Sequence, residues 1–364
     1  MLLESANDTV LQEDLEAIAN SDLPFEKLKN TTILITGATG LIGSQLAKAL
    51  AACNRIHGLN SKICILVRSV EKAESIFGDL LKRNDMEVIK GDILDPYTEY
   101  IEEKESIDYI FHTASVTASK MMVEQPVNTI YTSLNGTSNI LELAKEKQCK
   151  GVVYVSSMEM YGKFEKKGEK SPYIDEETLG YINPLEVRSN YPESKRMCEN
   201  MCVAYKKQYD LPVSVARLSQ TFGAGILQTE NRVFAQFARS AIRGEDIVLH
   251  TLGKSEGNYC YTRDTVRALI LLLVNGKRGE AYNIANEESH TTIANMAQMV
   301  CEKIAENKIN VIFDIPEGNT YGYAADTCMK LNTSKMQSLG WKPEIGLEEA
   351  YKRMIESMRN TKNY

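Results

Sequence analysis

The sequence has few of the residues that build metal sites and disulfide scaffolds. Among 364 residues there are eight cysteines, four histidines and one tryptophan, and the cysteines include no Cys-x-x-Cys pair. Cys198 and Cys202 stand four apart, but no pair of histidines lies near them, so we expect core residues rather than a zinc site. We therefore expect no metal, and the scattered thiols favour a reducing, cytoplasmic location.

An excess of positive charge and long apolar runs are also missing. The formal net charge is −7, and no stripe of lysines and arginines offers a surface for nucleic acid. The densest apolar run, 268–274, is shorter than the roughly 18 residues that a membrane span needs. The chain opens without a basic start and a continuous apolar core, so we expect no signal peptide. These absences predict a soluble protein with neither a membrane nor a nucleic acid as partner.

Apolar segments alternate with amphipathic ones along the first two thirds of the chain. A composition of 43% hydrophobic and 25% charged residues suits a globular protein with a sizeable core. The alternation predicts an α/β fold with a doubly wound parallel sheet. We expect strands at 33–35, 62–67, 87–90, 107–112, 151–156 and 212–218, and helices at 127–148 and 190–208.

The pattern also predicts three parts. Residues 1–29 form a helical extension, with Val10, Leu11, Leu15 and Ile18 at helical spacing. Residues 30–222 form a dinucleotide-binding domain, and 223–364 form a smaller mixed lobe, some segments of which return to the sheet. We expect the ligand between the lobes. A polar loop at 161–189 and a glycine-rich loop at 223–232 flank that place, followed by helices at 232–243, 262–275 and 292–306 and strands at 246–249 and 281–285.

Gly37, Gly40 and Gly43 come three apart, directly after the first apolar strand and at the start of a helical pattern. Such glycines permit a tight turn, a close approach of backbone amides to a pyrophosphate, and close packing of helix on sheet. An ordinary tight turn is the alternative. The strand before the loop and the helix after it favour a cofactor loop, to which Thr39, Leu41 and Ile42 belong.

Tyr191 and Lys195 form a Tyr-x-x-x-Lys pair on a predicted helix. Four residues make about one turn, so phenol and ammonium share a face, and the cation can lower the pKa of the tyrosine. Ser156 and Ser157 lie at the end of the fifth strand, where ligands meet an open parallel sheet. Ser157 can therefore share a proton with Tyr191.

In this order of motifs the chain resembles the extended short-chain dehydrogenase/reductase family of nucleotide-sugar epimerases, dehydratases and decarboxylases, over about residues 30–345. The resemblance implies a Rossmann fold, an acid/base role for Tyr191, contact of Lys195 with the nicotinamide ribose, and positioning of the reacting hydroxyl by Ser157. It also implies a homodimer through the helix after the fourth strand and the helix of Tyr191. The remaining cofactor contacts that it implies are Asp92, Ile93, Ala114 and Ser115.

Two stretches are similar to UDP-glucuronate decarboxylases in more detail. These are LGYINPLEVRSNYPESKR, ending at Arg196, and RLSQTFG, starting at Arg217. Glu159, in SSMEMYG, stands where these decarboxylases and the sugar-nucleotide 4,6-dehydratases have a glutamate near carbon 5. Once carbon 4 is a ketone, the substituents of carbon 5 become labile and a base can assist their loss. The alternative is a glutamate that binds loop amides.

Two positions depart from this pattern. Met158 stands where the decarboxylases carry a hydroxyl and the dehydratases an acid, and a thioether cannot donate a proton. Gly257 falls where the family usually has an arginine for the diphosphate or the sugar acid. Arg232 or Arg263 could substitute for it, so we take these two as candidate substrate contacts.

The second strand bears on the choice of cofactor. NAD-selective loops end this strand with an acid, whereas an arginine accommodates an extra phosphate. This chain has Arg68 and Ser69 there, which favours NADP. NAD remains an alternative, because an arginine can also stack on adenine.

Together the motifs predict an NAD(P)-dependent enzyme that oxidises a nucleotide sugar transiently at carbon 4, with dehydration, decarboxylation or epimerisation as the outcome. The resemblance associates such an enzyme with polysaccharide biosynthesis. A net NADPH-dependent reductase of a nucleotide-linked keto-sugar or ketose is the first alternative. A non-catalytic cofactor-binding protein is the second.

Overall fold

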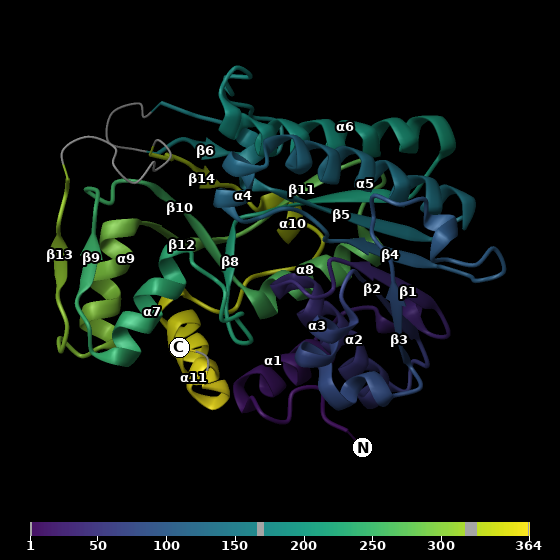
Figure 1. Cartoon of the computed structure of the whole chain (residues 1–364), viewed down its shortest axis with the longest axis horizontal. Helices are drawn as coiled ribbons and strands as arrows, with labels where there is room; N and C mark the ends of the chain where they lie inside the picture. The colour runs from purple at the N-terminus through teal and green to yellow at the C-terminus, as the bar shows by residue number, and fades with distance from the viewer. Residues whose placement is uncertain (1, 166–170, 317–325, 363) are drawn as a thin grey trace.

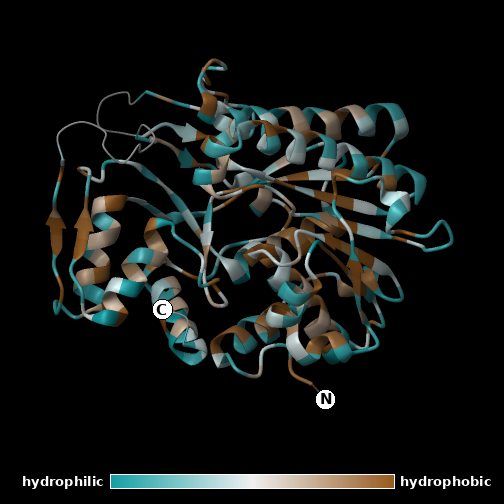
Figure 2. Cartoon of the chain, in the orientation of Figure 1, coloured by the Kyte–Doolittle hydropathy of each residue, from teal (hydrophilic) through white to brown (hydrophobic). Residues whose placement is uncertain are grey.

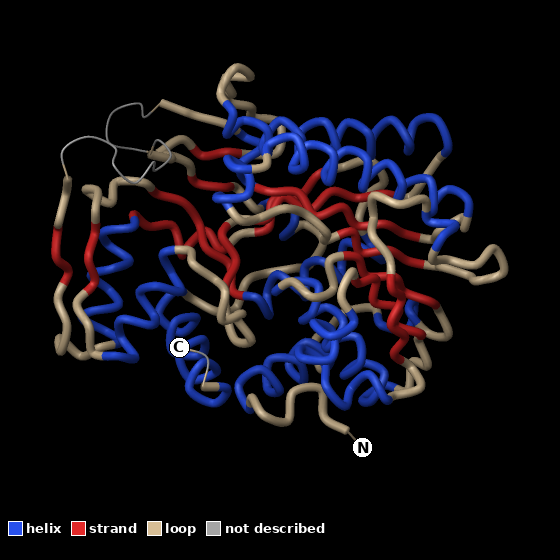
Figure 3. The backbone as a smooth tube through the Cα atoms, in the orientation of Figure 1, coloured by secondary structure: helices blue, strands red, loops and turns tan. Residues whose placement is uncertain are grey.

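The computed structural model describes residues 2–165, 171–316, 326–362 and 364. Its centre is a seven-stranded sheet in the order β11-β7-β5-β4-β1-β2-β3, and every neighbouring pair is parallel (Figures 1 and 3). The strands are β1 Thr32–Thr36, β2 Lys62–Val67, β3 Met86–Lys90, β4 Tyr109–His112, β5 Gly151–Ser157, β7 Val213–Leu218 and β11 Ala281–Ile284. The predicted doubly wound parallel sheet is thus confirmed.

Helices cover both faces of the sheet. On one face lie α2 Leu41–His57, α3 Val70–Phe77 and α8 Thr262–Asn275; on the other lie α4 Ser119–Glu124, α5 Pro126–Glu146 and α6 Asn190–Tyr209. Successive residues of a strand point to opposite faces. Ile33 and Ile35 of β1 accordingly join the core under α2, while Leu34 joins the core under α5 and α6. Figure 2 shows hydrophobic strands inside and hydrophilic helix faces outside.

The strand order reverses between β1 and β4, and this is where open α/β sheets bind ligands. Thr36 and His112 are the paired residues at the carboxyl ends of these two strands. The Nδ1 atom of His112 lies 2.7 Å from the hydroxyl oxygen of Thr36, and its Nε2 lies 3.2 Å from that of Thr137 on α5. The imidazole therefore ties together the two strand ends and the helix beside them.

The C-terminal part adds small sheets and helices. The strands β8 Gln220–Phe222, β10 Glu256–Tyr261 and β12 Asn286–Thr292 form one sheet; β9 Ile247–Leu249 pairs with β13 Val311–Phe313, and β6 Tyr173–Ile174 with β14 Lys330–Leu331. The helices here are α7 Val233–Arg243, α9 Ile293–Met299, α10 Ser334–Gln337 and α11 Leu347–Thr361. The helix expected at 292–306 is α-helical only to Met299 and continues as a π-helical turn, Val300–Ile304.

Short 3-10 turns complete the elements: η1 Phe25–Leu28, η2 Gly78–Lys82, η3 Tyr97–Glu99, η4 Met158–Tyr161 and η5 Val187–Ser189. The predicted loop 161–189 contains residues 166–170, and the predicted C-terminal lobe contains 317–325; both stretches lie outside the described residues. In the described ranges, no helix is long and apolar enough to cross a membrane.

The helix expected in residues 1–29 is α1 Thr9–Ala19, and it is part of the main core. Leu15 and Ile18 are fully buried, and α1 packs on α2, α8 and α11. Asp8 accepts a hydrogen bond of 2.5 Å from the Ser357 hydroxyl, and Asp14 forms an ion pair of 2.9 Å with Arg353. The N-terminal helix and the C-terminal helix α11 thus hold each other by buried polar contacts.

Candidate active site

The glycine loop between β1 and α2 leaves no space for side chains. A Cβ atom on Gly37, whose φ is +65°, would lie 2.7 Å from the Cα of Ala114, and one on Gly43 would lie 2.4 Å from the carbonyl oxygen of Gly37. Gly40 is the N-cap of α2 and offers no side-chain cap. Thr39 lies in the turn, and Leu41 and Ile42 are in the first turn of the helix. The amides of this turn are therefore accessible to an anion at the helix N-terminus.

The neighbouring turn after β4 contains Ala114 and Ser115. The amide of Ala114 donates to the Thr36 hydroxyl at 3.3 Å. Within the described ranges, the hydroxyl of Ser115 is buried and has no hydrogen-bond partner. A buried polar atom without a partner is unfavourable, and a bound polar ligand would satisfy it. The backbone cradle and this hydroxyl together fit a dinucleotide cofactor.

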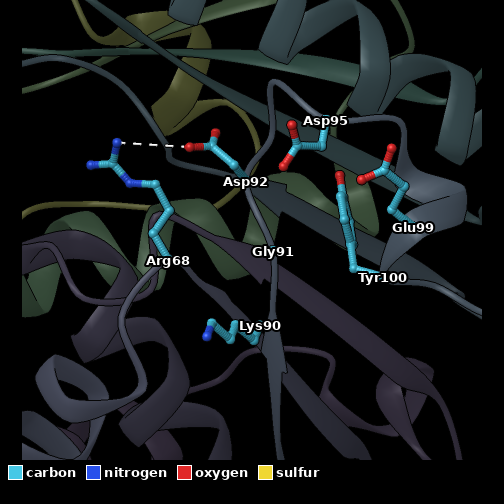
Figure 4. A pocket seen from close by; sticks show the side chains of 7 residues that line it. All are labelled: Arg68, Lys90, Gly91, Asp92, Asp95, Glu99 and Tyr100. Atoms are coloured by element: carbon cyan, nitrogen blue, oxygen red, sulfur yellow. Dashed lines mark ion pairs between the residues drawn. The ribbon is translucent and has the colours of Figure 1, made fainter.

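A pocket of about 390 Å³ opens beyond the ends of β2 and β3 (Figure 4). Arg68 follows β2, is 80% exposed in its side chain, and lies 3.9 Å from the carboxylate of Asp92. Ser69 caps α3 by accepting the amide of Lys72 at 3.1 Å. The pocket is lined by Arg68, Lys90, Gly91, Asp92, Asp95, Glu99 and Tyr100.

Ile93, next to Asp92, connects this pocket to α5. Its side chain touches Gly136, where a Cβ would lie 2.5 Å from the Ile93 Cδ1, and its carbonyl accepts Asn139 at 2.8 Å. The predicted cofactor residues therefore follow one edge of the sheet, from the glycine loop to the ends of β2, β3 and β4.

Tyr191 and Lys195, both on α6, are buried below the end of β5. The ammonium of Lys195 donates to the Val155 carbonyl at 2.8 Å and lies 5.7 Å from the centre of the Tyr191 ring. Burial lowers the pKa of Lys195 to about 8, so it is mostly charged at neutral pH. Burial, and to a lesser degree Glu159, raise the pKa of Tyr191 to about 12, whereas Ser157, Arg188 and Arg232 oppose this shift. The predicted serine, tyrosine and lysine thus lie together.

Glu159 lies on η4, two residues after Ser157, and accepts a charged partner. The Nη2 atom of Arg188, on η5, lies 2.9 and 3.2 Å from its two carboxylate oxygens. The guanidinium carbon of Arg188 is 5.8 Å from the centre of the Tyr191 ring. The carboxylate is therefore bound by an arginine beside the tyrosine, and the loop amides expected in the alternative are not its main partner.

Two further arginines, Arg217 and Arg196, fix the positions of the elements that carry Tyr191 and Glu159. Arg217 on β7 donates to both oxygens of Glu199 on α6, with its Nη2 at 2.7 Å, and Glu199 also accepts the Ser156 hydroxyl at 2.6 Å. Arg196 donates to the carbonyls of Met160, at 2.7 Å, and of residue 180, at 2.8 Å. These contacts fix η4 and α6 against β5.

The candidate substrate arginines have different surroundings. Arg232 precedes α7, pairs with Glu230 at 2.6 Å, and acts electrostatically on Tyr191. Arg263 on α8 pairs instead with Asp14 of α1 at 3.6 Å and with Glu344 at 3.0 Å. The charge of Arg232 thus helps to lower the pKa of Tyr191, whereas the guanidinium of Arg263 is held by Asp14 and Glu344.

The sequence assigned no role to several residues of the site, although Arg188 lies in the stretch that is similar to the decarboxylases. Arg188 lies within the stretch that ends at Arg196, and Glu199 lies just after it. Only the fold brings Arg188 to Glu159 and Glu199 to Ser156. Lys90 and Tyr100 line the pocket of Arg68 from the end of β3 and the turn after it. A periodicity analysis does not identify such residues, because their roles depend on contacts between separate elements.

Comparison with known proteins agrees with this geometry. Residues 33–285 match the NAD dependent epimerase/dehydratase family. UDP-glucuronic acid decarboxylase 1 of Danio rerio is 30% identical over 328 residues, which cover 89% of this chain and 72% of that protein. The dTDP-D-glucose 4,6-dehydratase of Dictyostelium discoideum is 28% identical, covering 91% and 82%.

Among solved structures, the dTDP-glucose 4,6-dehydratase of Bacillus anthracis in complex with NAD has the same fold, with a TM-score of 0.73. It is 21% identical, and the match covers 92% of this chain and 98% of that one. The family resemblance found in the motifs, and the expectation of an enzyme of the epimerase/dehydratase type, are confirmed.

Proposed function

Because the chain belongs to the NAD dependent epimerase/dehydratase family, we propose that it rearranges the sugar of a nucleotide sugar after transient oxidation at carbon 4. The observation that carries this proposal is the convergence of Ser157, Glu159, Tyr191 and Lys195 at the end of β5, beside the glycine cradle. The decarboxylase and dehydratase to which the chain is similar act on nucleotide sugars, as their names state.

Each residue has its own role in the proposed oxidation at carbon 4. A bound oxidised nicotinamide supplies a hydride acceptor and a positive charge, and this charge lowers the pKa of a neighbouring phenol. Tyr191 takes the proton of the carbon 4 hydroxyl, and Ser157 holds that hydroxyl and shares its proton. Lys195, charged at neutral pH, stabilises the phenolate and holds the ribose. Burial of Tyr191 and Lys195 limits access of water to the proton transfer.

Glu159 acts at carbon 5 in this proposal. A ketone at carbon 4 acidifies the carbon 5 proton, and a carboxylate can take it up. The ion pair with Arg188 keeps the carboxylate in one position. Arg232 is proposed as a contact for the nucleotide, since it lies at the start of α7 and acts on Tyr191.

We propose NADP as the preferred cofactor. Arg68 and Lys90 place two cations around the pocket at the end of β2, and Ser69 begins α3, whose N-terminal amides favour a phosphate. The carboxylates of Asp92, Asp95 and Glu99 in the same pocket oppose this preference. The same cations favour the second candidate function, a net NADPH-dependent reductase of a keto-sugar, because reductive enzymes draw on that cofactor.

Further proposals concern organisation. Apolar side chains are exposed along α4, α5 and α6, which favours a homodimer formed through these helices: Val123, Val127, Tyr131, Met197 and Val203. The buried thiols, such as Cys53 and Cys260, favour a reducing cytoplasm. The division into 1–29, 30–222 and 223–364 places most of the proposed cofactor contacts in the middle part.

Mass spectrometry of reactions with a panel of nucleotide sugars tests the function. Loss of water indicates a dehydratase, loss of carbon dioxide a decarboxylase, and a new isomer of unchanged mass an epimerase. A gain of two hydrogens that depends on added NADPH indicates the reductase. Cofactor binding without any conversion would favour the non-catalytic alternative.

A further inference from the structure

The two positions at which the sequence departs from the decarboxylase pattern are in contact. A Cβ atom on Gly257 would lie 3.4 Å from the terminal methyl of Met158, and no other atom lies within 4 Å of it among the described residues. Met158 is on η4, directly before Glu159, and Gly257 is near the start of β10. The methyl of Met158 thus packs where a side chain at 257 would begin, at the junction of the sheet and the C-terminal part.

Met158 packs in a small cluster of buried hydrophobic side chains, close to the buried polar residues Glu256 and Asn258 that flank Gly257. It is 5% exposed and belongs to a cluster of buried side chains: Met160, Tyr161, Ile174, Ala285, Met329 and Leu331. A thioether accepts only weak hydrogen bonds and donates none. A carboxylate placed against this surface would lose water without gaining a partner, which is strongly unfavourable.

The cations around Glu159 and Tyr191 already have partners. Arg188 is paired with Glu159, and Arg232 with Glu230. Lys195 is buried under Tyr191 and donates to the Val155 carbonyl. A second carboxylate beside Glu159 would therefore meet a like charge, and the arginines could bind it only by leaving their present partners.

We infer that the sugar substrate carries an uncharged group on carbon 5, such as a hydroxymethyl or a methyl, and that Met158 and Gly257 form the wall that selects it. This inference rests on the proposed function. It also restricts the outcome: without a carboxylate on carbon 5 there is no carbon dioxide to lose, and elimination or epimerisation remains.

The test compares matched nucleotide sugars on the purified holoenzyme. UDP-glucose is set against UDP-glucuronate, and GDP-mannose against GDP-mannuronate, so that each pair differs only in the group on carbon 5. Dissociation constants come from calorimetry, and nicotinamide reduction is followed by absorbance. We expect a neutral sugar to bind at least about tenfold more tightly than its uronate, as burial of an unpaired charge requires.

Substitutions make the test specific to this wall. In the double variant Met158→Thr with Gly257→Arg, the smaller side chain makes room and the arginine supplies a charge, so the preference should shift toward the uronate by about tenfold or more. Met329→Thr makes the same chemical change within the apolar cluster and should leave the preference as in the wild type. If the double variant does not fold, the wild-type comparison alone decides.

The results of this comparison distinguish a failure of the inference from a failure of the proposed function. A wild-type enzyme that binds a uronate as tightly as its neutral partner overturns the inference but leaves the proposed function intact. If none of the nucleotide sugars in the wider panel, these four included, binds or reduces the cofactor, the proposed function fails, and the inference with it.

Discussion

Arg188 holds Glu159 and covers Tyr191 at the same time: its Nη2 lies 2.9 Å from one carboxylate oxygen of Glu159, and its guanidinium carbon lies 5.8 Å from the centre of the Tyr191 ring. The two groups proposed to act at carbons 4 and 5 are therefore coupled through one side chain. A cation between a carboxylate and a phenol favours the ionised form of both.

Replacing Glu159 with Gln should separate the two chemical steps. The amide keeps the size of the side chain but cannot accept a proton, so the step at carbon 5 should slow by about 10²- to 10⁴-fold while oxidation at carbon 4 continues. Reduced nicotinamide should then accumulate on the enzyme, visible by absorbance. Glu186→Gln, at an exposed glutamate directly before η5, is the control. Wild-type turnover in Glu159→Gln would remove Glu159 from the mechanism.

Replacing Arg188 with Met should change the pH dependence. Arg188 lowers the pKa of Tyr191, so its loss raises that pKa and leaves less phenolate at a given pH. We expect the rate of nicotinamide reduction to fall by about tenfold near neutrality, and to recover as the pH rises, since one pKa unit changes the phenolate population tenfold. Arg278→Met, at an exposed arginine paired with Asp210, controls for loss of charge. An unshifted pH profile would contradict the coupling.

Replacing Tyr191 with Phe should abolish hydride transfer but not cofactor binding. The ring still fills its buried site, but no oxygen accepts the proton of carbon 4, which should cost about 10²- to 10⁴-fold in rate. The cofactor released on denaturation measures its retention, and rapid mixing with substrate measures the rate. Tyr209→Phe, on the exposed end of the same helix, should behave as the wild type. Full activity of Tyr191→Phe would refute the assignment.

Replacing Arg68 with Ala tests the proposed NADP preference. The exposed guanidinium should contribute about 1–2 kcal/mol to binding of a phosphate, so affinity for NADP should drop about tenfold and affinity for NAD should change little. Fluorescence titration of both cofactors, at two salt concentrations, measures this. Lys82→Ala, at an exposed lysine of η2, is the control for charge. Tighter binding of NAD than of NADP by the wild type would reject the preference at once.

His112 should make the fold sensitive to acid. Burial, and to a lesser degree the charge of Lys195, lower its pKa from 6.5 to about 3, so the folded protein keeps it neutral while the unfolded chain takes up a proton below pH 6.5. Its contribution to the free energy of unfolding is fully present above pH 6.5 and is lost as the pH falls toward 3. At pH 5 this loss amounts to about 2 kcal/mol.

The measurement is chemical unfolding of the wild type and His112→Gln at pH 7.5 and pH 5. The variant lacks the titrating ring. Between pH 7.5 and pH 5 the wild type should therefore lose about 2 kcal/mol more of its free energy of unfolding than the variant. Equal losses in the two proteins would show that the imidazole is protonated in the folded state.

Elements with a strong local pattern follow closely from the sequence, wherever they lie in the chain. The strand expected at 62–67 and the helix expected at 262–275 have those same bounds, because an unbroken apolar strand or an amphipathic period is a local signal. The glycine spacing likewise predicts its loop, since a Cβ on Gly43 would clash with Gly37 and Ala38 of that same turn, although the clash at Gly37 involves Ala114, after β4.

The small sheets could not be predicted in the same way. The strand β12 has the sequence NEESHTT, which lacks an apolar run, and it is a strand because its partner β10 supplies the hydrogen bonds. The direction of Arg263 toward Asp14 likewise depends on α1, some 250 residues earlier in the chain. Partners so far apart leave no periodic signal, so the sequence does not reveal that Arg263 is paired with Asp14.

The packing of α1 against α11 has a consequence for the order of folding. Asp8 and Asp14 are buried in the finished protein by contacts that include Ser357 and Arg353, which leave the ribosome more than 300 residues later. Until then, α1 can rest on α2, but its carboxylates lack these partners. The sheet can therefore form during synthesis before α11 emerges, whereas the buried contacts of Asp8 and Asp14 are completed only when α11 packs against α1.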